Sequence, residues 1–163
     1  MDRIQMIFEH PLYRENFLGI QEAEKNRKYC RHDLAHFLDV ARICYIFSLE
    51  NGNVIEKSII YAAALLHDIG RLKQINENIP HDIAGAKLAE AILKDTGFDE
   101  SERSMVTEAI LHHRKKIRES CHRADELSYY LYKADKLSRQ CFCCQASDEC
   151  KWDSDKKNRI IYI

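Results

Sequence analysis

Apolar side chains recur along this chain at intervals of three and four residues, and short polar stretches separate the apolar runs. This spacing is typical of amphipathic helices packed around a core. It predicts helices over residues 11–27, 29–50, 53–68 and 82–97, and two more that begin at residues 101 and 125. No alternation of the strand type extends beyond a few residues, and no internal repeat is present. We therefore expect an all-α fold, a single-domain bundle of six or seven helices.

The expected helix starts carry residues suited to that place. Pro fits a first helical turn, and short polar side chains can cap free backbone N–H groups. The residues concerned are Pro11, Asp33, Asn53 with Glu56, Asp82 and Asp125. Residues 71–81, which contain Pro80, are expected to form a connection.

Composition narrows the class of protein. The 163 residues are 45% hydrophobic and 31% charged, with a net charge of −1, which fits one folded domain and gives no sign of a nucleic-acid-binding field. No apolar run has the roughly 18 residues of a membrane helix, and the first residues lack a secretory signal, so we expect a cytoplasmic protein. We divide it into an N-terminal helical segment (1–28), a central domain (29–140) and a Cys-rich extension (141–163) packed on that domain.

Ionisable side chains fall on apolar faces in five separate segments. They are His36, His67, Asp68, His81, His113 with His112 at the edge of its stripe, and Asp135. A single buried histidine is most often hydrogen-bonded within the core, and a helical protein with such histidines would bind no stoichiometric metal. Five segments together favour a shared partner, because each group would otherwise need its own. Imidazole and carboxylate ligands suit Fe, Mn, Co, Ni or Zn, as one ion or as two with Asp68 as a bridge.

The order of these residues resembles a known family. His36 stands four residues before Val-Ala, a helix ends in Leu-Leu-His-Asp-Ile-Gly, His81 precedes Gly-Ala, and Ile-Leu-His-His and Lys-Ala-Asp-Lys follow. Over about residues 30–139 this series is similar to the HD-domain superfamily of metal-dependent phosphohydrolases. The resemblance implies an HD-type helical bundle whose core metal ligands are His36, His67, Asp68 and Asp135. His81 and His112 or His113 match the extra ligands of members that hold two metals.

The resemblance also implies an activity. A metal-bound hydroxide would cleave a phosphate ester or anhydride of a small nucleotide-like substrate, with Asp68 at the reaction centre. Arg71 and Lys136 would neutralise phosphate oxygens, although Arg71 can equally be a cation at a helix end. The Gly-Tyr-Pro segment of the cyclic-dinucleotide-hydrolysing members is absent, since Arg-Lys-Lys follows His113. An HD-type di-iron oxygenase and a non-catalytic metal- or nucleotide-binding sensor are the alternatives.

Several neighbouring residues have a less specific signal. His32 lies one turn before His36 and can share an ion with it, but a surface position near a helix start is the favoured interpretation. Lys115 and Lys116 are expected on a solvated face. Oligomerisation is compatible with the sequence.

Seven cysteines in a chain without a secretory signal indicate reduced thiols or metal ligands rather than disulfides. Cys141, Cys144 and Cys150 have the spacing C-x2-C-x5-C and can hold zinc or an iron–sulfur cluster. A fourth ligand could come from Cys143, from Cys121 or from outside the chain. Buried structural thiols are the alternative.

Overall fold

The computed structural model describes residues 2–52, 55–114 and 123–161, and the side chains of 123–125 lie outside the description. Asn53, Lys115, Lys116 and Cys121 are therefore outside the described residues, and so is the capping role expected of Asp125.

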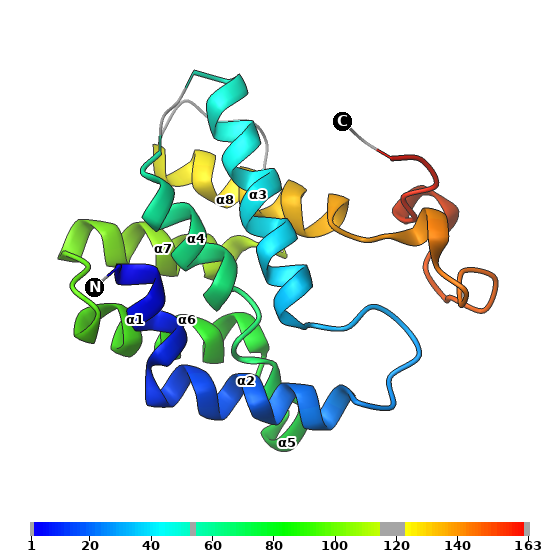
Figure 1. The fold of residues 1–163 in the computed structure, drawn as a ribbon, viewed down its shortest axis with the longest axis horizontal. Helices are drawn as coiled ribbons and strands as arrows, with labels where there is room; N and C mark the ends of the chain where they lie inside the picture. Colours follow the sequence, from blue (N-terminus) through cyan, green and yellow to red (C-terminus); the bar gives the residue numbers. More distant parts are fainter. Residues whose placement is uncertain (1, 53–54, 115–122, 162–163) are drawn as a thin grey trace.

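The described residues form α-helices and two short 3-10 helices, without a strand, so the all-α prediction is confirmed (Figure 1). The α-helices are α1 (Arg3–Glu9), α2 (Pro11–Glu24), α3 (Leu34–Glu50), α4 (Lys57–Leu66), α5 (Arg71–Glu77), α6 (His81–Asp95), α7 (Glu100–His112) and α8 (Arg123–Leu137). The 3-10 helices are η1 (Cys141–Cys143) and η2 (Ser154–Lys156).

Two of these helices are absent from the sequence prediction. The first ten residues contain α1, capped by the Asp2 carboxylate, which accepts the Ile4 N–H at 3.0 Å. The connection expected over 71–81 contains α5, which ends where Asn78 adopts a left-handed conformation with φ of 57°. Both helices have only seven residues, too few for a clear helical period.

The helix predicted from residue 29 begins five residues later. Asp33 caps α3 by accepting the His36 N–H at 2.9 Å, as its predicted role requires. Residues 25–33 form a loop between α2 and α3, which we call the α2–α3 loop. The loop passes close to the end of α8 and leaves room for a cavity there.

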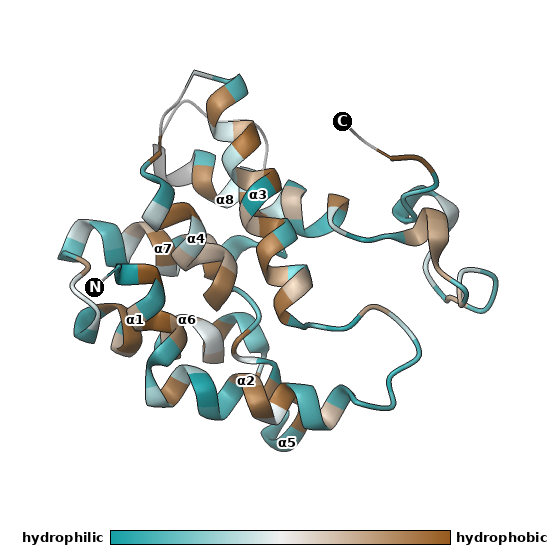
Figure 2. Cartoon of the chain, viewed as in Figure 1, coloured by the Kyte–Doolittle hydropathy of each residue, from teal (hydrophilic) through white to brown (hydrophobic). Residues whose placement is uncertain are grey.

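Helix α4 is the centre of the bundle. It contacts α1, α3, α6, α7 and α8, and seven of its ten residues are buried. Figure 2 shows α4 as apolar along most of its length. The polar residues that follow its last turn therefore lie deep in the molecule. Within the described chain no helix combines the length and apolar character needed to cross a membrane.

Candidate metal centre

The chain turns sharply after α4. Leu66 ends the helix, and the turn that follows holds His67, Asp68 and Gly70, with the Arg71 N–H bonded to the Asp68 carbonyl at 2.9 Å. A Cβ atom on Gly70 would lie 2.2 Å from the carbonyl oxygen of His81. The turn thus packs directly on the first turn of α6, because Gly70 has no side chain.

This close packing brings two parts of the centre together. The Asp68 carboxylate reaches His81, with 3.1 Å between Oδ1 and Nε2. In the sequence these residues are thirteen positions apart, and they lie in the turn after α4 and in the first turn of α6.

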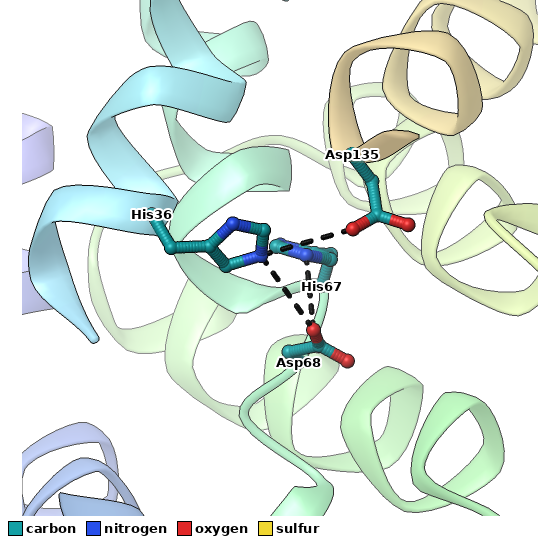
Figure 3. Close-up of side chains that lie close together, drawn as sticks. All are labelled: His36, His67, Asp68 and Asp135. Carbon is teal, nitrogen blue, oxygen red and sulfur yellow. Dashed lines mark ion pairs between the residues drawn. The ribbon is translucent and has the colours of Figure 1, made fainter. Parts of the chain in front are cut away.

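One group of ligating atoms consists of His36, His67, Asp68 and Asp135, and these atoms lie within 4.8 Å of one another. Oδ2 of Asp68 is 3.2 Å from Nε2 of His67 and 3.9 Å from Nε2 of His36. The His36 nitrogen is also 3.8 Å from Oδ1 of Asp135. Figure 3 shows the two rings and two carboxylates converging from α3, from the turn after α4 and from α8.

A second group consists of Asp68, His81 and His113. Oδ1 of Asp68 is 3.1 Å from Nε2 of His81 and 3.8 Å from Nε2 of His113, and the two histidine nitrogens are 3.2 Å apart. Asp68 therefore takes part in both groups and offers a different carboxylate oxygen to each. This is the arrangement expected of a bridging carboxylate.

The histidines are oriented by bonds on the far side of their rings. Each Nδ1–H can donate to an oxygen, which fixes the tautomer and leaves the Nε2 lone pair directed at the centre. The acceptors are the Ala64 carbonyl for His67 (2.7 Å), the Ile110 carbonyl for His113 (2.6 Å) and the Gln74 side-chain oxygen for His81 (2.7 Å).

His36 is oriented by a hydroxyl. Ser138 donates its O–H to the Asp135 carbonyl at 2.9 Å, so its oxygen is free to accept from Nδ1 of His36 at 3.1 Å. The Nε2 atoms of His36 and His67 are buried and have no hydrogen-bond partner. Two orphaned imidazole nitrogens beside two carboxylates are the donor set that a divalent transition metal requires, and the residues present fit such an ion.

Electrostatics agrees with a cation site. Burial lowers the pKa of His36 and of His113 to about 4, so both rings are neutral ligands at neutral pH. Burial opposes the charged form of Asp68, but the charge of His67 together with hydrogen bonds from His67 and His81 outweighs it and keeps the pKa of that carboxyl well below its usual range. Burial likewise opposes the charge of His67, but the Asp68 carboxylate, with Asp135 and the Ala64 carbonyl, outweighs it and raises the His67 pKa. A divalent ion would replace that proton.

Two residues beside the centre were not among the predicted ligands. Nε2 of His32 is 3.5 Å from Oδ2 of Asp68, so His32 belongs to the centre rather than to the surface that we favoured. Glu24, at the end of α2, orients it by accepting from Nδ1 of His32 at 2.7 Å and from its backbone N–H at 2.9 Å. The four-residue spacing of His32 and His36 was a signal for the first residue. No local signal pointed to Glu24, which is eight positions away.

The predicted ligands include one that the structure places elsewhere. His112 is half-exposed on α7, where Nδ1 bonds to the Glu108 carbonyl at 2.9 Å, and it belongs to neither group. His113 follows the last residue of α7 and its ring turns inward. Of the two neighbouring histidines, His113 is thus the buried one, as helical periodicity predicts.

The predicted phosphate-binding cations lie around the centre. The Lys136 ammonium pairs with the Asp135 carboxylate. Arg71 donates to Gln74 at 3.0 Å and lies 3.4 Å from Nδ1 of His81, so it also borders the second group.

The centre opens into a cavity of about 560 Å³. His36, Asp68, His81, His113 and Asp135 line its inner part, and its wall comes from the α2–α3 loop and from the end of α8. The basic residues that line the cavity are Arg27, Lys28, Arg31, Arg71, Arg114, Lys136 and Arg139.

The cysteines of the extension line the same cavity. Cys141, Cys144 and Cys150 are found there together with Cys143 and with Cys30 of the α2–α3 loop. Among the described residues no three thiols come within 4.8 Å of one another, so the metal or cluster site predicted at these cysteines stays a prediction.

Comparison with known proteins identifies the fold. The HD domain family model matches residues 33–140. An uncharacterized protein of Clostridium beijerinckii is 39% identical over 162 residues, which cover 99% of each chain. The crystal structure of a predicted HD superfamily hydrolase from an uncultured Thermotogales bacterium aligns with a TM-score of 0.61 and 25% identity, over 88% of this chain and 80% of that one. The matched region holds every member of both ligand groups, and the chain belongs to the HD domain family.

Proposed function

We propose that this protein is a metal-dependent phosphohydrolase that cleaves a phosphate ester or anhydride of a small nucleotide-like molecule. The observation that supports it most is the position of Asp68, which joins two groups of metal-ligating atoms at the inner end of a cavity with basic walls. Carboxylate and imidazole ligands favour a transition metal such as Fe, Mn, Co, Ni or Zn over Ca or Mg.

One or two ions would be held by this chain. His36, His67, Asp68 and Asp135 form the first set of ligands, and Asp68, His81 and His113 form the second. When bound, such ions activate water and neutralise phosphoryl charge. The hydrogen bonds behind the rings keep every Nε2 pointing inward, so the chain presents its ligands without reorganisation.

The basic wall supports an anionic substrate. Lys136 is already held beside the centre by Asp135, and Arg71 borders His81. Both can reach oxygens of a phosphoryl group at the ligands, where positive charge stabilises the transferring group. Phosphate would thus bind at the inner end of the cavity.

Aromatic residues of the outer wall support a nucleotide-like substrate. Tyr29 and Trp152 line the cavity and are partly exposed, by 37% and 46%. Aromatic rings at such a position can stack on a base or another flat group. The volume of about 560 Å³ is within the range of small-molecule sites and favours a mononucleotide-sized ligand over a polymer.

The test is phosphate release from a panel of phosphomonoesters and phosphoanhydrides by protein loaded with Mn²⁺, Co²⁺ or Fe²⁺. We expect turnover that Asp68→Ala reduces by about 100-fold or more, because changes behind metal ligands alone reduce activity by 10- to 100-fold. His112→Ala is the matched control, since this neighbouring histidine lies outside both groups.

Three results would contradict the proposal. Turnover that survives Asp68→Ala would place the reaction elsewhere. Oxygen-dependent turnover of iron-loaded protein without phosphate release would identify an HD-type oxygenase. Tight binding of nucleotides by fully metallated protein, without any hydrolysis, would identify a sensor.

A further inference from the structure

The Cys-rich extension lies against the α2–α3 loop, and Figure 1 shows both segments on the same side of the molecule. The Lys28 ammonium pairs with the Glu149 carboxylate, and the Tyr29 hydroxyl donates to the Glu149 carbonyl at 3.2 Å. The next residues in the two segments are Cys30 and Cys150. The contact at Glu149 therefore brings these two cysteines into the same neighbourhood, where both line the cavity.

The extension has almost no core of its own. Beyond residue 139, Ala146 is the one buried hydrophobic side chain of the described residues, while Phe142 and Trp152 are 44% and 46% exposed. Its helices η1 and η2 have three residues each. Apolar burial of this extent cannot order a segment of about twenty residues, and small folded segments of this kind need a cross-link or a metal.

The extension is nevertheless folded back on the domain. The Asn158 side chain donates to the carbonyls of Lys136, Leu137 and Arg139 at 2.8, 3.2 and 2.9 Å, which satisfies the free end of α8. The Lys157 ammonium donates to the Ser147 carbonyl at 2.8 Å. Residues 138–158 thus form a closed loop, and its cysteines lie between the two ends.

The thiols within this loop are not equivalent. Cys141 and Cys144 flank the turn of η1, in which the Cys144 N–H bonds to the Cys141 carbonyl at 3.4 Å. This turn holds the two ends of the C-x2-C pair close together. The Cys143 thiol instead donates to the Gln140 carbonyl at 3.5 Å, which directs it to the backbone of its own turn. Three thiols of the extension and Cys30 therefore remain as ligands.

We propose that Cys30, Cys141, Cys144 and Cys150 form a tetrathiolate site for one zinc ion, which ties the extension to the α2–α3 loop. Four cysteine thiolates are a common ligand set of closed structural zinc sites. Each thiol releases its proton when it binds, and zinc undergoes no change of oxidation state. The thiols do not form a group within 4.8 Å among the described residues, so binding is expected to draw them together.

The charges around Cys30 are consistent with this site. Burial raises the pKa of Cys30, and the neighbouring Cys141 and Cys144 raise it further, against the opposing charge of Arg139. Thiolates that repel one another need a cation before they can ionise together. Zinc affinity at this site should consequently increase with pH.

The site would also fix one wall of the cavity. The Arg139 guanidinium lies 3.9 Å from the centre of the Trp152 ring and 3.9 Å from Oδ2 of Asp135. Trp152 follows Cys150 by two residues, so the zinc would hold this ring against the end of α8. The tetrathiolate site is independent of any reaction at the HD centre.

The test measures metal content and thiolate ligation in the full chain, purified under reducing and anaerobic conditions. Asp68→Ala serves as the background, because it removes a ligand common to both groups of the HD centre. We expect about one zinc per chain in this background, and less than a tenth of that after Cys30→Ser. Cys143→Ser and Cys121→Ser are the matched controls, and both should retain the zinc.

Cobalt substitution provides a second readout that does not depend on zinc content. Co²⁺ at four thiolates gives sulfur-to-metal charge-transfer bands and the visible bands of a tetrahedral ion, whereas imidazole and carboxylate ligands give no sulfur band. Cys30→Ser should weaken these bands while the helical circular dichroism persists, because Cys30 lies in a loop outside the helices.

Four outcomes would overturn the proposal. They are a zinc content unaffected by Cys30→Ser, loss of zinc in Cys143→Ser, an iron–sulfur absorption spectrum, and a disulfide between these cysteines in protein that binds no zinc. This test does not measure phosphohydrolase activity. A failure of the zinc proposal can therefore be told apart from a failure of the proposed function.

Discussion

Replacing Gly70 by alanine tests how the turn after α4 builds the metal centre. Gly70 has φ of −74°, which any L residue adopts, so its backbone conformation does not require glycine. The added Cβ would instead lie 2.2 Å from the His81 carbonyl oxygen and 2.4 Å from the Gly85 nitrogen. Real Cβ contacts are essentially never shorter than 3.0 Å, and both obstacles are backbone atoms. The first turn of α6 must therefore move away from the turn at Asp68.

The expected loss of stability is about 3 kcal/mol, the upper end of the usual range for overpacking, because no flexible side chain can give way. For a chain of this length that loss lowers Tm by about 6–12 °C. His81 moves with α6, which lengthens the 3.1 Å separation of its Nε2 from Oδ1 of Asp68. Metal affinity at the group of Asp68, His81 and His113 should fall with it.

Thermal unfolding by circular dichroism and metal titration by calorimetry measure the two effects. Gly52→Ala is the matched control, since Gly52 has φ of 69° and a Cβ added there would meet no atom within 4 Å, so only about 1 kcal/mol of backbone strain is expected. A Gly70→Ala protein that unfolds within about 2 °C of the wild type and binds metal normally would refute the role of this close contact.

Three further changes follow from the same geometry. Ser138→Ala removes the acceptor behind His36 and should weaken metal binding by roughly 10- to 100-fold with little change in Tm; unchanged affinity in a metal titration would contradict this. His113→Ala should reduce the bound metal measured by mass spectrometry, whereas His112→Ala should not, and the reverse result would exchange their roles. The metal-free protein should lose stability as the pH falls from about 6.5 to about 4, by up to about 1.4 kcal/mol per pH unit for each of His36 and His113, because their folded pKa of about 4 lies below the unfolded value. His67, whose folded pKa is raised, changes the stability mainly near and above the unfolded pKa of about 6.5, so a flat profile below about pH 6 in urea unfolding would contradict the burial of the other two.

The sequence by itself determined the helical fold and most of the centre. Helical periodicity is a local property, so it placed His36, His67 and His113 on apolar faces before any contact was known, whereas His81 was assigned to the end of the 71–81 connection. Each then lay buried or nearly buried beside Asp68. Asp33 was likewise predicted as a cap, because capping involves only the next three residues. Short helices such as α5 were not predicted, because a helix of seven residues has too few turns to show a hydrophobic periodicity.

Tertiary structure alone decided which groups meet. Glu24 orients His32 across a loop, and Ser138 orients His36 from a helix about a hundred residues away, and neither pairing leaves a pattern in the chain. Gly70 was predicted as a helix stop, yet its larger effect is the close approach to α6, which depends on how two helices cross. Cys30 is separated from the thiols of the extension by more than a hundred residues, and only the contacts at Glu149 bring it to their neighbourhood. Local chemistry fixes which side chains can act, and packing between distant segments fixes which of them act together.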